Sequence, residues 1–282
     1  MDFAVRTLTL PGGVTLPYVE QGEPSGTPVV LLHGITDSWR AFEMLLPHLP
    51  NSLRAFAITQ RGHGEASRPE SGYAPADFAR DVAEFLTALN IPGAIIAGHS
   101  MGSYVAQRFA IDYPERTLGL VLLGTSFDMR GNLGLNTFWA QVVSGLADPV
   151  PRSVAMDFQT STLAKAIPAE YLDIFVEESL KVPARVWRAA FRAMLDEDHS
   201  GDLRNVTAPT LILWGDRDAF FEREDHARVA SAIAGSRMIT YAGAGHAMHW
   251  EEPVRVARDI TGFASEVAEL SRMQTSKQRQ AS

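Results

Sequence analysis

The sequence has no cysteine, no excess of basic residues and no long apolar run. Without cysteine there is no disulfide framework, no thiolate zinc site and no cysteine nucleophile. The 25 Lys and Arg residues against 33 Asp and Glu residues leave a formal net charge of −8, which opposes binding to phosphate backbones and anionic membranes. No apolar stretch reaches the length of about 18 residues that a membrane helix needs. These absences predict a protein with neither nucleic-acid nor membrane partners.

What is present is typical of a soluble globular protein: 46% of the residues are hydrophobic and 21% are charged. The first ten residues carry an acid at Asp2 and no apolar stretch of signal-peptide length. We therefore expect a cytoplasmic protein. Its 282 residues allow one large domain or two small ones, and they suffice for a sizeable core.

Short apolar segments recur along the chain and predict buried strands. A hairpin is expected first, from residues 3–10 and 15–20, which flank a Pro-Gly-Gly turn. The later predicted strands are residues 29–32, 55–58, 94–97, 118–123 and 210–214. Segments of helical periodicity separate them, so the pattern predicts an α/β fold with a mostly parallel central sheet and helices on both faces.

The alternation breaks once, between Gly124 and Thr210, where four helical segments follow one another. Insertions at the carboxyl end of a strand usually cover the ligand crevice. We therefore expect a helical cap insertion at residues 127–203, with the core formed by residues 1–126 and 204–265. Residues 266–282 are expected to be the end of a helix and a flexible tail, because the chain is polar from Met273 onward.

Residues 98–102, Gly-His-Ser-Met-Gly, fit the pattern G-x-S-x-G. The pattern alone is a weak signal, but here it directly follows the predicted strand 94–97 and precedes a helical stretch at 104–113. In this setting a serine is held on a sharp turn, where glycines make room for neighbouring backbone. Ser100 is therefore the candidate nucleophile.

With these residues the chain resembles the α/β-hydrolase family, over almost all of residues 1–265. The resemblance rests on five motifs in the order that the family shows: His33-Gly34, residues 61–64 (Arg-Gly-His-Gly), the turn at Ser100, residues 215–218 (Gly-Asp-Arg-Asp) and Gly245-His246. The most similar branch contains capped esterases, lactonases and epoxide-hydrolase-like proteins. The resemblance implies an oxyanion hole formed by the backbone N–H groups of Ile35 and Met101.

A serine hydroxyl needs a base to remove its proton, and the chain has eight histidines. The resemblance and a preceding small-residue loop select His246. The other histidines are expected to have other roles: His249 lines the pocket or caps a helix, His99 is structural, His33 and His63 bond to loop backbone, and His48, His199 and His226 lie at the surface.

The third catalytic member is an acid that bonds to the imidazole. The family pattern G-x-x-D selects Asp218. Asp216 in the same loop and Asp128 after an earlier strand remain as alternatives.

The leading hypothesis is a serine hydrolase that cleaves a carboxylic ester or lactone of a small hydrophobic substrate through an acyl-enzyme, as a monomer or homodimer. Ser catalysis of this kind needs no cofactor and no metal. Residues expected to bind the substrate are Trp39, Phe127, Phe138, Trp139, Trp187, Phe191, Phe220 and His249. The alternatives are a carbon–carbon bond hydrolase, a cofactor-free perhydrolase and a non-catalytic small-molecule receptor. An epoxide hydrolase is disfavoured because it needs a carboxylate in place of Ser100.

Overall fold

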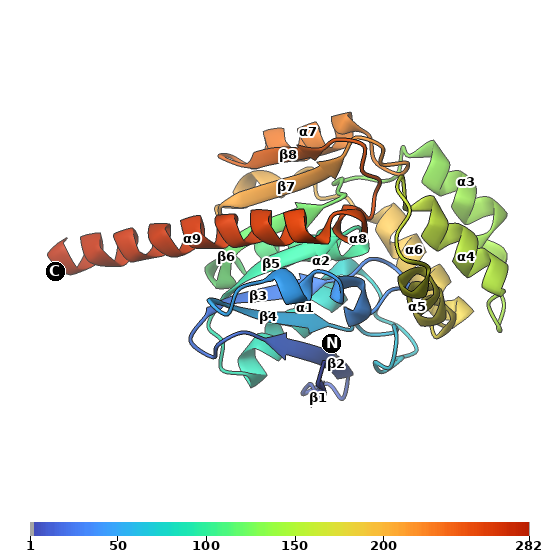
Figure 1. Cartoon of the computed structure of the whole chain (residues 1–282), viewed down its shortest axis with the longest axis horizontal. Coiled ribbons are helices and arrows are strands. Elements are labelled where there is room, and N and C mark those ends of the chain that lie inside the picture. The colour runs from blue at the N-terminus through green and yellow to red at the C-terminus, as the bar shows by residue number, and fades with distance from the viewer. Residues whose placement is uncertain (1–2, 282) are drawn as a thin grey trace.

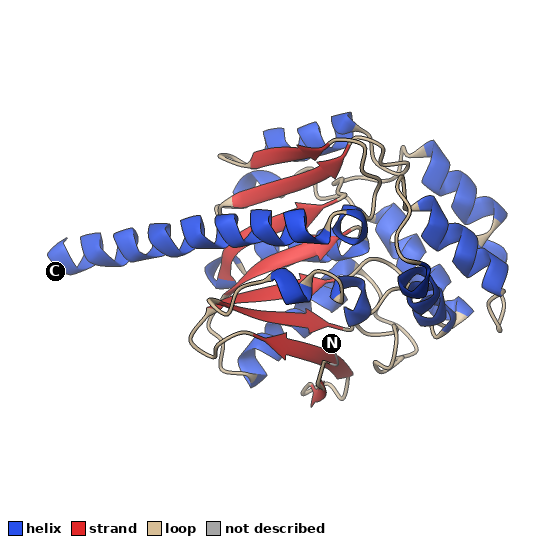
Figure 2. Ribbon diagram, in the orientation of Figure 1, coloured by secondary structure: helices blue, strands red, loops and turns tan. Residues whose placement is uncertain are grey.

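A computed structural model describes residues 3–281, and an eight-stranded sheet runs through their centre (Figures 1 and 2). The spatial order is β1-β2-β4-β3-β5-β6-β7-β8. The strands are β1 (Val5–Thr9), β2 (Thr15–Gln21), β3 (Thr27–Leu32), β4 (Leu53–Ile58), β5 (Ala94–His99), β6 (Thr117–Leu123), β7 (Thr210–Gly215) and β8 (Arg237–Tyr241). β1 and β2 form the predicted antiparallel hairpin, β2 is antiparallel to β4, and the remaining pairs are parallel. The predicted α/β class is confirmed.

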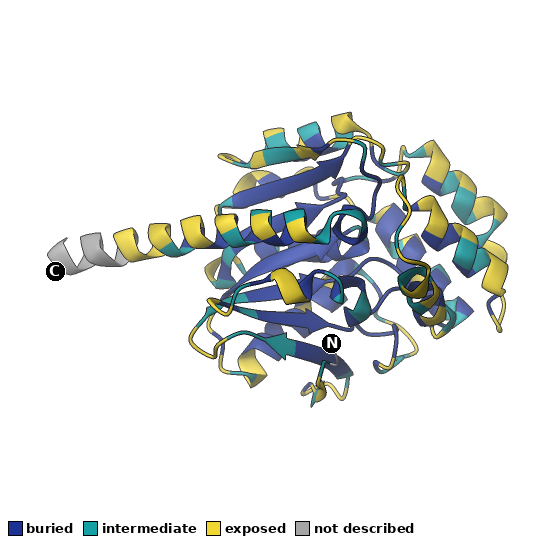
Figure 3. Ribbon diagram, viewed as in Figure 1, coloured by how far each residue is buried: buried dark blue, intermediate teal, exposed yellow. Residues whose placement is uncertain are grey.

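Alternate residues of each parallel strand pack on opposite faces of the sheet, as the pleat requires. Val30 and Leu32 face a cluster with α1 (Pro75–Ala88), α2 (Met101–Asp112) and α7 (Arg223–Ala232). Val29 and Leu31 face a second cluster with α8 (Met248–Glu251), α9 (Pro253–Ala281) and the short 3₁₀ helices η1 (Trp39–Phe42) and η2 (Leu46–His48). The central strands are consequently buried on both sides (Figure 3).

A group of helices between β6 and β7 forms what we call the helical insertion, residues 133–196. It consists of α3 (Leu133–Gln141), η4 (Val143–Gly145), α4 (Arg152–Ser161), α5 (Ala169–Leu180) and α6 (Ala184–Asp196). These helices lie beyond the carboxyl ends of the parallel strands (Figure 1). Much of their outer surface is exposed (Figure 3).

The chain ends in α9, which runs to Ala281 and projects past the sheet (Figure 1). The expected flexible tail from Met273 is therefore helical up to Ala281, and Ser282 lies outside the described residues. Elongating an existing helix is much easier than nucleating one, and this segment contains neither Gly nor Pro. Within residues 3–281, no helix combines the length and the apolar character needed to span a bilayer.

Candidate active site

Ser100 lies on a tight turn between β5 and α2. Its backbone adopts φ 52° and ψ −117°, which is unusual for a residue other than glycine. The turn brings backbone segments very close together: a Cβ on Gly98 would stand 2.0 Å from the carbonyl oxygen of Gly102, and one on Gly102 would stand 2.1 Å from that of Leu32. Both glycines are therefore required by the packing of this turn, which presents Ser100 at the end of the sheet.

His246 and Asp218 come from the loops after β8 and β7 and meet beside this turn. The His246 Nδ1 atom lies 2.8 Å from Asp218 Oδ2. Asp218 Oδ1 accepts bonds from the backbone N–H groups of Phe220 and Phe221, at 2.8 and 3.0 Å. Burial acts to raise the pKa of Asp218, but His246 and these hydrogen bonds outweigh it and hold that pKa below its usual value. An ionised Asp218 orients the imidazole with Nδ1 as the donor, which leaves Nε2 without a proton.

Neither competing acid contacts His246. Asp216 Oδ1 accepts a bond from the backbone N–H of Gly243 at 2.6 Å and so shapes the loop before His246. Asp128 pairs with Arg130, at 2.9 Å. Asp218 is therefore the carboxylate that this geometry places against the imidazole.

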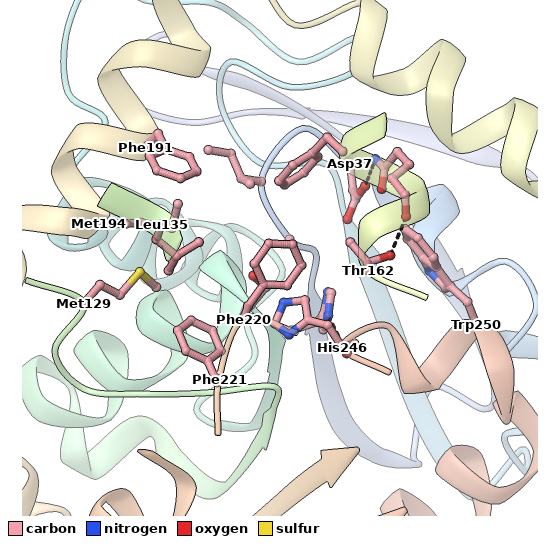
Figure 4. A pocket seen from close by; sticks show the side chains of 16 residues that line it. Asp37, Met129, Leu135, Thr162, Phe191, Met194, Phe220, Phe221, His246 and Trp250 are labelled. Atoms are coloured by element: carbon pink, nitrogen blue, oxygen red, sulfur yellow. Dashed lines mark hydrogen bonds between the residues drawn. The ribbon is translucent and has the colours of Figure 1, made fainter. Parts of the chain in front are cut away.

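Ser100 and His246 line a cavity under the helical insertion (Figure 4). Most of the lining is apolar or aromatic. The lining residues are Gly34, Ile35, Asp37, His99, Ser100, Met129, Leu135, Phe158, Gln159, Thr162, Phe191, Met194, Phe220, Phe221, His246 and Trp250. A lining of this kind suits a small, largely apolar ligand.

The predicted oxyanion donors occupy suitable positions. Ile35 lines the cavity in the loop after β3. Met101 is the first residue of α2, where backbone N–H groups have no partner within the helix. Their joint action on an oxyanion stays a prediction.

Of the eight residues predicted to bind substrate, Phe191 and Phe220 line the cavity. The structure places the other six elsewhere. Trp187 and His249 are fully buried in the packing, and Trp139 stacks on Phe191. Trp39 packs on Phe3, Phe127 lies under Arg228, and Phe138 lines a neighbouring groove. Helical periodicity identifies an apolar face but does not say which neighbour that face meets.

Two predicted surface histidines are buried, which corrects the sequence-based expectation. His226 Nε2 accepts the backbone N–H of Thr125 at 2.9 Å, and burial lowers the pKa of His226 to about 4. His199 Nδ1 lies 3.0 Å from Gln107 Oε1. Each histidine satisfies a polar group of the interior, a use that a single sequence does not reveal.

Two residues that support His246 are not among those predicted from the sequence. Gly124 follows β6 with φ 54°, and a Cβ there would stand 2.8 Å from His246 Nδ1. Its position directly after a buried strand was the available signal. Glu251 accepts the backbone N–H of Gly245 at 2.9 Å through Oε2, and that of Ala164 at 2.6 Å through Oε1. It thereby ties the loop of His246 to the segment between α4 and α5.

Within the part of the chain that the structure describes, no group of three or more His, Asp or Glu side chains is arranged to hold a metal ion.

Comparison with known proteins places this site in a family. Residues 27–253 match the model of the alpha/beta hydrolase fold family. That match covers most of the chain, so the protein belongs to this family.

Several relatives cover nearly the whole chain. A 2-(acetamidomethylene)succinate hydrolase from Mesorhizobium japonicum is 28% identical over 89% of this chain and 92% of its own. A non-heme chloroperoxidase from Streptomyces lividans is 26% identical over 91% of this chain and 98% of its own. The crystal structure of an esterase from a Rhodococcus species is 28% identical, covers 93% of this chain and 99% of its own, and superposes with a TM-score of 0.81.

Proposed function

We propose that this protein hydrolyses a carboxylic ester or lactone of a small, largely apolar substrate through an acyl-enzyme at Ser100. The observation that supports this most strongly is the grouping of three side chains: Ser100 on its tight turn, His246 beside it in the cavity, and Asp218 at 2.8 Å from His246.

In the proposed reaction His246 Nε2 takes the Ser100 proton while Oγ attacks the ester carbonyl. The backbone N–H groups of Ile35 and Met101 stabilise the oxyanion. The tetrahedral intermediate collapses, and the alcohol leaves with the proton from His246. Water, activated by His246, then attacks the acyl-enzyme, and the acid and free Ser100 are released.

The experiment that tests this proposal combines labelling with a substrate screen. A fluorophosphonate probe should label the wild type at Ser100 and leave Ser100→Ala unlabelled. A panel of 4-nitrophenyl esters from acetate to octanoate, with γ- and δ-lactones, should show turnover that Ser100→Ala lacks. Labelling of another serine, or a labelled protein without turnover, would contradict the proposal; the second outcome would point to a receptor.

Perhydrolysis is a second candidate, favoured by the relatives named as non-heme chloroperoxidases. Hydrogen peroxide would then replace water in attack on the acyl-enzyme and release a peracid. Adding hydrogen peroxide to the same ester assay and measuring peracid separates the two nucleophiles.

A further inference from the structure

One side of the cavity is polar, and this polarity is not used by the proposed reaction. Figure 4 shows Asp37 and Thr162 on the side opposite Phe191 and Met194. Asp37 lies in the loop after β3, and Gln159 belongs to α4 of the helical insertion. Both side chains line the same cavity as Ser100. A substrate bound over Ser100 therefore meets apolar groups on one side and a carboxyl group on the other.

Asp37 is buried without a cationic partner. Its exposure is only 4%, and Gln159 Nε2 donates to its Oδ1 at 2.8 Å. Among residues 3–273, whose side chains the structure describes, no Arg or Lys forms an ion pair with it. Burial raises the pKa of Asp37 to about 7, and Glu178 of α5 adds to this rise. The Gln159 bond, nearby His246 and a hydrogen bond from the backbone N–H of Gly34 oppose it. A buried carboxyl group without a counter-ion costs stability, so packing alone gives no reason for it.

The surrounding structure holds this carboxyl group in place. The preceding residue, Thr36, has φ 71°, a left-handed conformation that is strained for a residue other than glycine. The Oγ1 atom of Thr36 lies 2.9 Å from Ser179 Oγ of α5, and Gln159 Nε2 donates to Ser179 Oγ at 2.8 Å. The loop of Asp37 is thus fixed from two helices of the insertion. A polar group fixed in this way is organised for a ligand before the ligand binds.

The position of the carboxyl group limits what it can contact. Gln159 occupies Oδ1, and Oδ2 lies beside Gly34, 3.0 Å from where a Cβ on that residue would stand. Gly34 immediately precedes Ile35, the candidate oxyanion donor. A group that bonds to Asp37 would therefore lie close to the reacting carbonyl.

We propose that Asp37 and Gln159 form a specificity site for an acyl group that carries a hydroxyl or amino group on its second or third carbon. A carboxyl group accepts hydrogen bonds from such donors in either ionisation state, whereas an ionised carboxyl repels another carboxylate. This inference rests on the proposed function of Ser100. Because of this repulsion, we do not expect this protein to hydrolyse the succinate compound named for the Mesorhizobium relative.

The test compares ethyl esters that differ in one group. The pairs are 3-hydroxybutanoate with 3-methylbutanoate, and 2-hydroxybutanoate with 2-methylbutanoate; 3-aminobutanoate and monoethyl succinate add a cation and an anion. The wild type should prefer the hydroxy ester of at least one pair about tenfold in kcat/KM, the size of one buried hydrogen bond. Asp37→Leu should abolish this preference, which is measured as the ratio of kcat/KM for the two members of a pair. This variant should also hydrolyse monoethyl succinate about tenfold better.

Two further variants keep the test decisive. Asp37→Asn preserves the shape, so it should lose the preference for the amino ester and keep part of that for the hydroxy ester. Leu195→Met, a buried substitution outside the residues that line the cavity, is the control for a general change of packing and should keep the wild-type ratios. An equal preference in the wild type and in both Asp37 variants would overturn the proposal.

A binding measurement separates this inference from the proposed function. Dissociation constants of the same ester pairs on Ser100→Ala should show the same preference without turnover. If the wild type hydrolyses none of the esters, the proposed function fails, but a preference in binding would still support the specificity site. Equal binding of both members of each pair would overturn the site, whatever the turnover.

Discussion

Two regions hold the residues of the cavity in different ways. One is the edge of the sheet at which the parallel strands have their carboxyl ends, which we call the sheet edge, and the other is the helical insertion. At the sheet edge, backbone contacts fix Ser100, and a carboxylate with three hydrogen bonds fixes His246. In the insertion, Phe158 and Phe191 are held by packing against other aromatic rings. Substitutions at the sheet edge should therefore affect every substrate, whereas those in the insertion should affect substrates according to their size.

The largest expected effect is at the sheet edge. Ser100→Ala or His246→Ala should each lower kcat by about 10⁵-fold for every ester, and the double variant should be little worse, because residues of one catalytic unit are not additive. Steady-state kinetics on short and long esters checks this. A loss confined to long esters would break the contrast between the two regions.

Asp218→Asn should follow, with a fall in kcat of about 10⁴-fold, because the amide no longer favours the imidazole tautomer that accepts the Ser100 proton. Asp216→Asn is the matched control in the same loop and should remain near the wild type. Kinetics and circular dichroism of both variants measure this difference. Equal activities of the two variants would show that Asp218 is not the catalytic acid.

Gly124→Ala should lower kcat by about 100-fold, since the new methyl group would stand 2.8 Å from the His246 ring and displace it. Gly145→Ala is the control, because a Cβ at Gly145 has no heavy atom within 4 Å. The displacement should leave labelling of Ser100 by a fluorophosphonate slower but still present. A variant with wild-type kcat would show that the imidazole does not need this space.

A smaller and selective effect is expected in the insertion. Phe191→Ala should lower the hexanoate-to-acetate ratio of kcat/KM about tenfold, because it removes apolar contact with the longer chain. Trp139→Ala, which removes a ring stacked on Phe191, controls for lost packing and should change the ratio less. If Phe191→Ala reduces both esters equally, the ring supports the site rather than the acyl chain.

The smallest effect is on pH-dependent stability and concerns His249 of α8, which follows the loop of His246. Burial, together with His246, lowers the pKa of His249 to about 3. Below pH 6.5 His249 takes up a proton in the unfolded chain, whereas in the folded chain it stays neutral down to about pH 3. The free energy of unfolding therefore decreases as the pH falls below 6.5. Between pH 7 and 5 the wild type should lose about 2 kcal/mol more than His249→Phe. Urea unfolding measures this, with surface His48→Phe as the control; equal losses would contradict it.

The same two regions differ in how far the sequence predicts them. Strands buried on both faces appear as short apolar runs, and the turn at Ser100 is a local pattern, so the sheet and its candidate nucleophile could be predicted. The contact of Gln159 with Asp37 joins residues 122 positions apart, and no local pattern announces it. Among the predicted substrate-binding residues, which aromatic rings meet the cavity depends on the rotation of each insertion helix against its neighbours.

Glu251 has a mechanical consequence. Its carboxylate bonds at once to the segment that leads from α4 to α5 and to the loop that carries His246. Any outward swing of that segment must either break the bond to Ala164 or pull the His246 loop along. The position of this segment and the position of the base are therefore coupled, so an opening there would also displace the imidazole until the segment returned.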